Sequence, residues 1–323
     1  MKVYLAPLEG LADPPLRKIL CACGGYDCCY TEFIRVTDEG LSEKTLLHDC
    51  PELLNGGKTD DGTPCRVQLL GDNPDAMARG AALASKLGAP ALDINFGCPS
   101  RFVHHSGSML LKEPGLMRAI VLAVRQALPP GIPLSVKIRS GFADKSELPS
   151  IMEAVAQQGV SEVAVHCRTR AELYRRQALD WSVLKPLHEA FPNVSIVANG
   201  DIVSKETAEE CERVSGCTSL MTGRGAFMVP NLGHVIKDGA KPFSDAQTLM
   251  QVRRTVELFI SMGIEREKII TDRAKQFLSY ARLASPVLSA FFRAFCHCQG
   301  VSECLKMIDS KINELEGSTE ERQ

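Results

Sequence analysis

The sequence predicts an α/β fold, namely a parallel (β/α)8 TIM barrel followed by a C-terminal, all-α helical bundle domain. Three observations in the 323 residues lead to this prediction. Eight short apolar runs recur along the chain, amphipathic segments separate them, and strand-like runs stop after about Pro242. Alternating strands and helices predict a parallel sheet with right-handed crossovers. A count of eight favours closure into a barrel over an open doubly wound sheet.

The predicted barrel elements follow one another in regular order. The strands are the short apolar runs Val3–Ala6, Cys28–Phe33, Cys65–Leu70, Ala91–Asn95, Leu134–Ile138, Glu162–His166, Ser195–Ala198 and Ser219–Thr222. The helices between them carry apolar residues three and four positions apart, and several open with Asp, Ser or Pro, which favour helix starts. These helices are Asp13–Cys23, Pro74–Leu87, Pro114–Leu128, Glu147–Gln158, Trp181–Ala190 and Ser204–Val214.

The C-terminal part of the chain shows helical periodicity alone. The predicted helices are Asp245–Met262, Arg266–Ala284, Pro286–Cys298 and Ser302–Leu315. The sequence therefore predicts a barrel domain at residues 1–242 and a helical domain at residues 243–316. The polar residues 317–323 are expected to form a frayed tail.

Composition indicates a globular, soluble protein. The chain is 45% hydrophobic and 24% charged, and no stretch approaches 18 uninterrupted apolar residues. An acid at Glu9 comes too early for a signal peptide. We therefore expect a cytoplasmic protein that has no membrane partner and acts as a monomer.

Thirteen cysteines raise the question of disulfides or a metal site. The clustered Cys21, Cys23, Cys28 and Cys29 lack paired C-x-x-C spacing, and an odd total prevents complete pairing. Side chains of the run Cys296-His-Cys298 on a helix would point in different directions and could not close one metal shell. Reduced thiols without a metal are the favoured interpretation.

The net charge of −2 gives no global basic footprint of the kind that nucleic-acid binders show. A polyanion would have to bind a local patch. The best candidate is Arg168-Thr-Arg-Ala-Glu-Leu-Tyr-Arg-Arg176, in which four arginines surround an aromatic residue within nine positions. The alternative interpretation of this segment is a solvated loop.

Cys98 lies between Gly97 and Pro99 directly after a predicted strand. In a parallel α/β fold, the chain just past a strand end faces the active site, so this thiol is a candidate reagent. The alternative is a small buried hydrophobic residue, as cysteine often is. A thiol with a pKa near 8.5 is mostly protonated at neutral pH, so Cys98 could donate a proton as readily as it could attack.

Polar residues gather at the ends of the predicted strands, which converge at one mouth of a barrel. They are Glu9, Glu32, Arg35, Gln68, Asn95, Cys98, Lys137, Arg139, His166, Arg168, Asn199, Asp201 and Arg224. Taken singly, Lys137 could pair with a carboxylate, and His166 could be a satisfied core imidazole. Two glycine segments, Ala198–Ile202 and Thr222–Ala226, follow the last two strands, where barrels commonly hold phosphate. Together they predict a phosphate-bearing cofactor such as FMN.

At this point the residues match a known pattern. The matching segments are Ala6-Pro-Leu-Glu-Gly10, Thr31-Glu-Phe33, Val67-Gln-Leu69, Asn95-Phe-Gly-Cys-Pro-Ser100, Val136-Lys-Ile-Arg139, Val165-His-Cys-Arg-Thr169, Ala198-Asn-Gly-Asp201 and Gly223-Arg-Gly225. This set resembles the tRNA-dihydrouridine synthases, over nearly the whole chain to about residue 315. Thr31–Val36, the His166-to-Trp181 loop and Ala274–Tyr280 look most like the bacterial C-type members. Those members are associated with the uridine at D-loop position 16.

The resemblance implies an FMN-dependent, NADPH-driven reduction of tRNA uridine, in which Cys98 protonates C5 of the uracil while hydride reaches C6. The residues that look like FMN ligands are Pro7, Leu8, Glu9, Gln68, Lys137, His166, Asn199, Gly200, Asp201, Gly223 and Arg224. Lys137 would stabilise the negative charge of reduced flavin. The barrel residues that resemble uracil or tRNA contacts are Arg35, Asn95, Tyr174 and Arg176. Local cations Arg273 and Lys275 of the helical domain are expected to bind tRNA as well.

One loop departs from the family pattern. Val103–Met109 replaces a loop that usually ends Gly-Gly-Ala or Ala-Gly-Ser, and His104 replaces a usual Asn, which affects substrate positioning. Two other functions remain open: a flavin barrel that acts on a free pyrimidine or another small molecule, and a flavin-free RNA-binding barrel. The helical domain and the Arg168–Arg176 loop favour tRNA over a small molecule.

Overall fold

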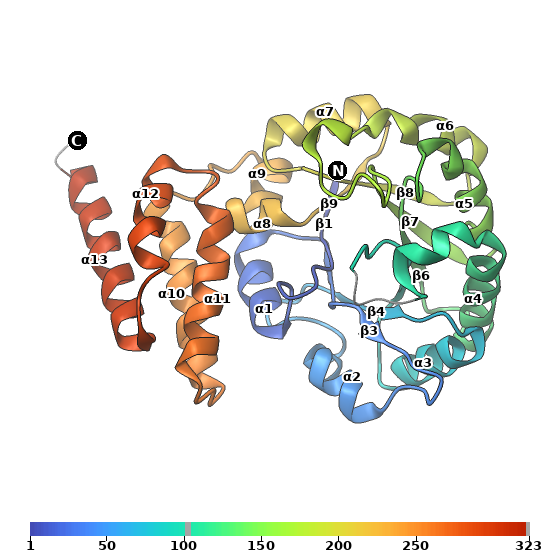
Figure 1. Ribbon diagram of the computed structural model, residues 1–323, viewed down its shortest axis with the longest axis horizontal. Coiled ribbons are helices and arrows are strands. Elements are labelled where there is room, and N and C mark those ends of the chain that lie inside the picture. Colours follow the sequence, from blue (N-terminus) through green and yellow to red (C-terminus); the bar gives the residue numbers. More distant parts are fainter. Residues whose placement is uncertain (101–104, 321–323) are drawn as a thin grey trace. The chain divides into compact units, whose positions relative to one another are not determined.

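A computed structural model describes residues 1–100 and 105–320 of the chain (Figure 1). Its sheet is parallel throughout and follows the order β2-β1-β9-β8-β7-β6-β5-β4-β3, and a β2–β4 pairing closes it into a barrel. The strands are β1 (Lys2–Leu5), β2 (Cys28–Tyr30), β3 (Ile34–Arg35), β4 (Cys65–Leu70), β5 (Leu92–Asn95), β6 (Leu134–Arg139), β7 (Val160–His166), β8 (Ser195–Asn199) and β9 (Ser219–Thr222). The predicted barrel is confirmed.

The second predicted strand, Cys28–Phe33, is divided in the structure into β2 and β3, which both pair with β4. The division falls at Thr31, whose side-chain oxygen accepts the backbone N–H of Gln68 at 2.9 Å. A side chain thus continues the hydrogen bonding where the strand leaves the ladder. The sequence pattern shows the apolar run. It does not show that the Thr31 hydroxyl accepts a hydrogen bond where a backbone carbonyl would do so in a continuous strand.

Helices surround the barrel strands (Figure 1). They are α2 (Glu43–Asp49), α3 (Pro74–Lys86), α4 (Pro114–Ala127), α5 (Leu148–Val155), α6 (Lys185–Ala190) and α7 (Lys205–Ser215). Local sequence explains their starts, since Asn73 caps α3 and proline opens α3 and α4. The predicted helices Glu147–Gln158 and Trp181–Ala190 each begin as a 3-10 turn, at Lys145–Glu147 and Trp181–Leu184. Two further 3-10 turns are Pro51–Asn55 and Gly107–Lys112, and a fifth is Arg176–Ala178.

The chain divides into two compact units. The barrel unit contains residues 1–14, 26–202 and 206–223, and the helical unit contains residues 15–25, 203–205 and 224–323. The predicted boundary after residue 242 therefore lies within the helical unit. The observed boundary differs from the predicted one because three helices belong to the same unit as the C-terminal helices. They are α1 (Pro14–Gly24), α8 (Arg224–Met228) and α9 (Leu232–Asp238).

The helical unit is held by an apolar interior. Its long helices are α10 (Asp245–Ser261), α11 (Glu267–Ala281), α12 (Pro286–Phe295) and α13 (Gly300–Glu320). Phe227 of α8 packs edge-on against Phe277 of α11 with ring centroids 5.2 Å apart. Helix α13 continues past the predicted end at Leu315, so residues 317–320 of the expected tail are helical and 321–323 lie outside the described residues. None of the helices among the described residues is long and apolar enough to cross a membrane.

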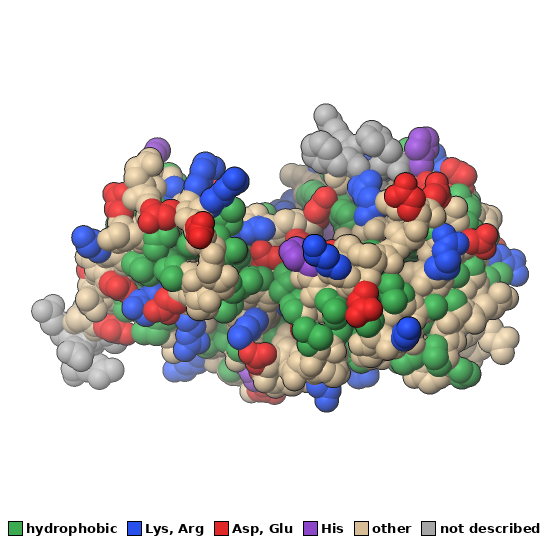
Figure 2. All heavy atoms as spheres, turned by 90° about the horizontal axis from the view of Figure 1, so that it is seen from below, with side chains coloured by type: hydrophobic (Ala, Val, Ile, Leu, Met, Phe, Trp, Pro, Cys, Tyr) green, Lys and Arg blue, Asp and Glu red, His purple; other side chains and the backbone are tan. Residues whose placement is uncertain are grey.

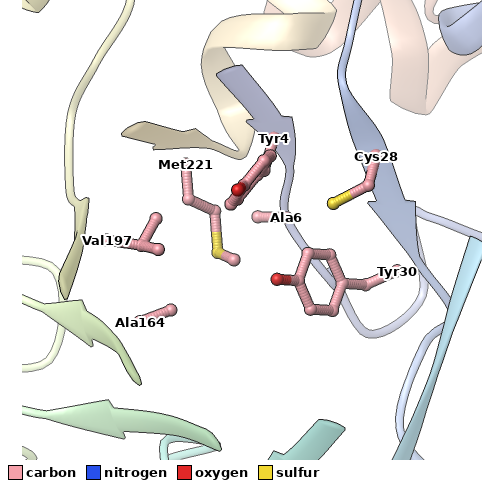
Figure 3. Packing of buried hydrophobic residues seen from close by; sticks show 7 residues of the cluster. All are labelled: Tyr4, Ala6, Cys28, Tyr30, Ala164, Val197 and Met221. Carbon is pink, nitrogen blue, oxygen red and sulfur yellow. The ribbon is translucent and has the colours of Figure 1, made fainter. Parts of the chain in front are cut away.

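Inside the barrel, alternate residues of each strand point inward. Figure 3 shows seven of them: Tyr4, Ala6, Cys28, Tyr30, Ala164, Val197 and Met221. Arg66 of β4 reaches across the interior to Glu162 of β7 at 2.6 Å, with its guanidinium 5.4 Å from the ring centroids of Tyr4 and of Tyr30. Both charges lie near the N-terminal ends of their strands. Side chains therefore fill this part of the barrel, and the C-terminal strand ends are left to build a site.

Candidate active site

The turn that carries Cys98 is held by the last residue of β5. The Asn95 side-chain oxygen accepts the backbone N–H groups of Gly97 and Cys98, both at 2.9 Å. The Cys98 carbonyl in turn accepts the backbone N–H of Ser108 at 3.0 Å and its hydroxyl at 2.7 Å. Asn95, predicted as a substrate contact, is only 6% exposed, so its first task here is to shape this turn.

The Cys98 thiol is an acid rather than a nucleophile at neutral pH. Its Sγ donates to the Glu9 carboxylate at 3.7 Å. Burial, together with the negative charge of Glu9, raises the pKa of Cys98 to about 11 against the lowering effects of Ser100 and Arg139. A thiol with that pKa holds its proton throughout the physiological range, so it can donate a proton to a carbon centre.

Below the turn, three buried side chains form a continuous hydrogen-bonded chain. Gln68 Nε2 donates to Asp93 at 2.7 Å, and Asn95 Nδ2 donates to Gln68 Oε1 at 2.7 Å. Ser135 donates its hydroxyl to the other Asp93 oxygen at 2.5 Å. Gln68 was predicted as a cofactor ligand, whereas sequence reasoning missed Asp93. The only signal for Asp93 was an acid inside an otherwise apolar strand.

Lys137 of β6 is 9% exposed and donates from Nζ to the Asn199 side-chain oxygen at 2.9 Å. Asn199 is fixed in turn, since its Nδ2 donates to the Met221 carbonyl at 2.8 Å. Burial lowers the pKa of Lys137 to about 8, and the charge of Arg139 adds to this effect. The acceptor is an amide oxygen and not a carboxylate. The ammonium charge therefore stays available to an anionic ligand.

The glycine segment after β8 has the backbone conformation that its sequence predicts. Gly200 has φ +134, and a Cβ there would lie 2.6 Å from Leu179 Cδ1, so no larger residue fits without movement. The Gly200 carbonyl accepts the Trp181 indole N–H at 3.1 Å. Asp201, with φ +48, uses both carboxylate oxygens to bind the Arg168 guanidinium.

Arg168 corrects one expectation. The sequence groups it with the arginines of a possible polyanion-binding loop, but its side chain is fully buried. Besides Asp201, it donates to the Arg175 carbonyl at 2.7 Å. Residue type alone suggested solvent exposure, whereas a partner carboxylate from the next strand end makes burial favourable. Arg175 and Arg176 remain exposed on the same loop.

Arg139 joins the Cys98 turn to the loop after β7. This guanidinium is 2% exposed and donates to three carbonyls, those of Gly97 at 2.8 Å, Thr169 at 3.2 Å and Leu173 at 2.9 Å. It also lies 5.2 Å from the ring centroid of Tyr174. The ring of Tyr174 stands edge-on to His166 at 5.9 Å and is 54% exposed, as a stacking surface for a ligand must be.

The other predicted site residues are distributed over both units. In the barrel unit, Pro7 and Leu8 follow β1, Arg35 is exposed on β3, and Gly223 follows β9. In the helical unit, Arg224 opens α8, and Arg273 and Lys275 lie on α11. Arg273 donates to Gln276 at 2.8 Å, and Lys275 donates to the Cys298 carbonyl at 2.9 Å. Val103 and His104 of the atypical loop lie outside the described residues.

One group of possible metal ligands occurs among the described residues, away from these side chains. Ligand atoms of Cys50, Glu52 and Cys65 lie within 4.8 Å of one another, and all three residues are buried. Cys65 begins β4, at the strand end opposite to the mouth. Three ligands fall short of the four that tetrahedral zinc requires, so proximity alone does not define a metal centre here.

A closed parallel barrel whose strand ends hold a buried ammonium, a protonated thiol and a fixed amide defines the protein as a (β/α)8-barrel enzyme. Residues 4–315 match the family described as dihydrouridine synthase (Dus). The chain belongs to this family of oxidoreductases.

Curated relatives agree with this assignment, and a solved structure shares the fold. The chain is 39% identical over 317 residues to the tRNA-dihydrouridine(16) synthase of Shewanella oneidensis, covering 98% of this chain and 99% of the relative. It is 39% identical to the enzyme of the same name from Haemophilus influenzae, covering 97% and 100%. Morphinone reductase in complex with tetrahydroNAD shares the fold at a TM-score of 0.52 and 9% identity, over 76% of this chain and 90% of that one.

Proposed function

We propose that this protein reduces uridine to 5,6-dihydrouridine at D-loop position 16 of tRNA, with FMN as cofactor and NADPH as reductant. The observation that carries the proposal is the protonated Cys98 thiol, which Asn95 holds at a strand end of the barrel. The relatives named tRNA-dihydrouridine(16) synthase support the substrate and the position. The proposal includes action as a monomer in the cytoplasm, where tRNA is modified.

The residues at the strand ends fit FMN. Lys137 offers an ammonium that contacts no carboxylate of residues 1–100 and 105–320 directly, which suits the negative charge near N1 of a reduced flavin ring. Gln68 of β4, His166 of β7 and Asn199 of β8 offer further polar groups. At Gly200 a φ of +134 favours glycine, and the backbone N–H groups of such a turn can approach a phosphate.

Further proposed FMN contacts are Pro7, Leu8, Glu9, Gly223 and Arg224. Asp201 has a different part, because its carboxylate is committed to Arg168. We assign it to orienting the Gly200 turn instead of contacting the cofactor. These residues would hold FMN, and FMN reduced by NADPH would supply the hydride chemistry for C6 of the uracil.

Cys98 completes the reduction by protonating the uracil. The S–H bond breaks, a C–H bond forms at C5, and a thiolate remains on Cys98. The high pKa ensures that the proton is present before the reaction and that the thiolate readily recovers one afterwards. Glu9, 3.7 Å from the sulfur, disfavours the thiolate through its negative charge and so keeps the proton on Cys98 before the reaction.

Recognition of tRNA would use cations of each unit and an exposed ring of the barrel unit. A uridine must leave the loop stack to reach the barrel mouth, and an unstacked base binds well to aromatic and guanidinium planes. In the barrel unit, Tyr174, Arg175 and Arg176 provide such groups, with Arg35 as a further cation. Residues 243–316, with Arg273 and Lys275, would act as a tRNA-binding domain. On the face drawn in Figure 2, basic side chains are interspersed with acidic ones, so local contacts must do this work.

The proposal is tested on purified protein and unmodified tRNA. Wild-type protein should be yellow, carry one FMN per chain, oxidise NADPH and form dihydrouridine at position 16. Replacement of the proton donor, Cys98→Ala, should leave flavin binding and NADPH-driven flavin reduction intact. Dihydrouridine formation should fall by about 10²- to 10⁴-fold, the usual contribution of a general acid.

A matched control is Cys296→Ser, which changes a partly exposed thiol of the helical unit. It should modify tRNA at the wild-type rate. Wild-type reduction of free uridine in preference to tRNA would identify a small-molecule enzyme instead. A colourless protein that takes up no added FMN would identify an RNA-binding barrel, and a fully active Cys98→Ala variant would remove Cys98 from the reaction.

A further inference from the structure

Asp93 lies in the barrel interior and does not reach the mouth, yet it is linked to the Cys98 turn. It is fully buried, as is Gln68, and Asn95 is 6% exposed. The links run from Asp93 to Gln68 at 2.7 Å and from Gln68 to Asn95 at 2.7 Å. Asn95 then accepts the N–H groups of Gly97 and Cys98 at 2.9 Å. Every link is a side-chain hydrogen bond between neighbouring strands or within one turn.

The Asp93 carboxylate fixes which end of each amide in this hydrogen-bonded series donates and which end accepts. An ionised carboxylate only accepts hydrogen bonds, so Gln68 must turn its NH₂ group toward Asp93 and its oxygen away. The Gln68 oxygen then requires the NH₂ group of Asn95. That choice leaves the Asn95 oxygen facing the turn, where two backbone N–H groups need an acceptor.

Reversing both side-chain amides would cost free energy at the Gly97–Cys98 turn. If both amides were reversed, the Asn95 NH₂ group would face the N–H groups of Gly97 and Cys98. Two donors would lose their acceptor in a partly buried place, and unsatisfied polar groups of this kind are expensive. An isolated amide has no strong preference between its two orientations, so a fixed acceptor at the far end of the chain is what excludes the wrong one.

Other contacts of Asp93 agree with an ionised, acceptor-only group. Its second oxygen accepts the Ser135 hydroxyl at 2.5 Å. Burial raises the pKa of Asp93 to about 6, while the hydrogen bonds from Ser135 and Gln68 and the charges of Arg66 and Lys137 oppose that rise. Asp93 is therefore mainly ionised at neutral pH. The backbone N–H of Gln68 is bonded separately to Thr31 at 2.9 Å, so the strand itself does not depend on the carboxylate.

We propose that Asp93 is a positioning residue for Cys98: through Gln68 and Asn95 it selects the amide orientation that holds the Gly97–Cys98 turn. The consequence for uridine reduction rests on the function proposed above. The turn itself can be measured without substrate or cofactor. Asp93 is fully buried and would act through Gln68 and Asn95, so it is not itself a catalytic residue.

Three variants separate this role from simple destabilisation. Asp93→Leu keeps the approximate shape but removes the acceptor. Asp93→Asn can still offer an oxygen to Gln68 while its NH₂ faces Ser135, whose hydroxyl already lies 3.3 Å from the Leu92 carbonyl as an alternative acceptor. Ser135→Ala removes the other partner of Asp93 and leaves the Gln68 arm in place.

The first measurement is amide hydrogen exchange of Gly97 and Cys98 in cofactor-free protein. Asp93→Leu should speed exchange at both amides by about tenfold or more, because the turn loses a defined acceptor. Asp93→Asn and Ser135→Ala should stay near wild type. If Asp93→Leu does not fold, Gln68→Met breaks the same chain one link later and should give the same faster exchange.

The second measurement is the rate of dihydrouridine formation beside the rate of flavin reduction by NADPH. Asp93→Leu should slow the first by about tenfold or more, with rescue by Asp93→Asn, and change the second far less. Wild-type exchange at Gly97 and Cys98 in folded Asp93→Leu, or equal effects of Ser135→Ala, would overturn the proposal. A wild-type protein that leaves tRNA unmodified would instead refute the proposed function, while the exchange result would still stand.

Discussion

The two ends of the barrel bury charge in opposite ways. Near the N-terminal ends of the strands, Arg66 and Glu162 contact each other directly at 2.6 Å, between the rings of Tyr4 and Tyr30 shown in Figure 3. Near the C-terminal ends, Lys137 contacts the neutral Asn199. An opposite charge within contact distance cancels the field of its partner, whereas an amide fixes a charge without cancelling it.

This difference separates structure from chemistry within one set of strands. The Arg66–Glu162 pair joins β4 to β7 and has no unneutralised charge to offer a ligand. Lys137, by contrast, has a pKa lowered to about 8, first by burial. An anionic ligand would reverse that lowering and gain binding energy from it. The N-terminal end should therefore respond to mutation in stability, and the C-terminal end in ligand binding.

The largest expected effect belongs to the N-terminal end. Arg66→Met should lower the free energy of unfolding of the barrel by about 3–5 kcal/mol, because Glu162 would be left buried without its partner. Urea unfolding of the cofactor-free protein measures this loss. The double variant Arg66→Met with Glu162→Gln should regain much of it. A loss below about 1 kcal/mol, the value of a surface pair, would show that the pair does not hold the barrel.

An intermediate effect is expected at Lys137. The ammonium form prevails below its pKa of about 8 and would donate a charge-assisted hydrogen bond to the flavin, so FMN affinity should decline as pH rises through 8. Lys137→Met should weaken FMN binding at pH 7 by about 10- to 100-fold, the value of one charge-assisted hydrogen bond, and remove the pH dependence near 8. Flavin fluorescence titration measures both.

The matched control for Lys137 is Lys185→Met, which changes an exposed lysine of α6. Its FMN affinity and pH profile should equal those of the wild type. An unchanged FMN affinity in Lys137→Met would mean that the buried charge at the C-terminal end of the barrel does not serve ligand binding.

The smallest expected effect is on the helical unit, outside the compared strands. Arg273→Ala combined with Lys275→Ala should weaken tRNA binding a few-fold and reduce the slope of log affinity against log salt by about two, one for each phosphate contact. NADPH-driven flavin reduction should not change. Lys268→Ala, an exposed position on the same helix, serves as the control. An unchanged salt slope in the double variant would remove α11 from the tRNA interface.

The sequence predicted the fold well because parallel barrel strands are buried on both faces. Runs such as Leu134–Ile138 are short and apolar, and helices with one apolar face separate them. Short elements escaped the prediction: α8 and α9 are too brief for helical periodicity to show. Their grouping with the C-terminal helices depends on contacts such as Phe227 with Phe277, which are distant in sequence.

For the site, the sequence predicted which residues stand at strand ends but not their partners. Lys137 was recognised from its place in the chain, yet the choice between a carboxylate and an amide partner needed the neighbouring β8 residue Asn199. Arg168 was grouped with solvated arginines because its partner Asp201 follows a different strand. Hydrogen bonds between strands connect residues whose spacing in the sequence carries no signal.

The three carbonyl contacts of Arg139 restrict how this family member can change in evolution. A planar guanidinium can serve Gly97, Thr169 and Leu173 at once, whereas the single ammonium of lysine cannot reproduce that fork. Replacement of Arg139 would therefore have to be accompanied by new hydrogen-bond donors on two loops, which no single substitution provides. Position 139 is therefore epistatic with both loops: a substitution of Arg139 is tolerated only when the sequences of both loops change with it.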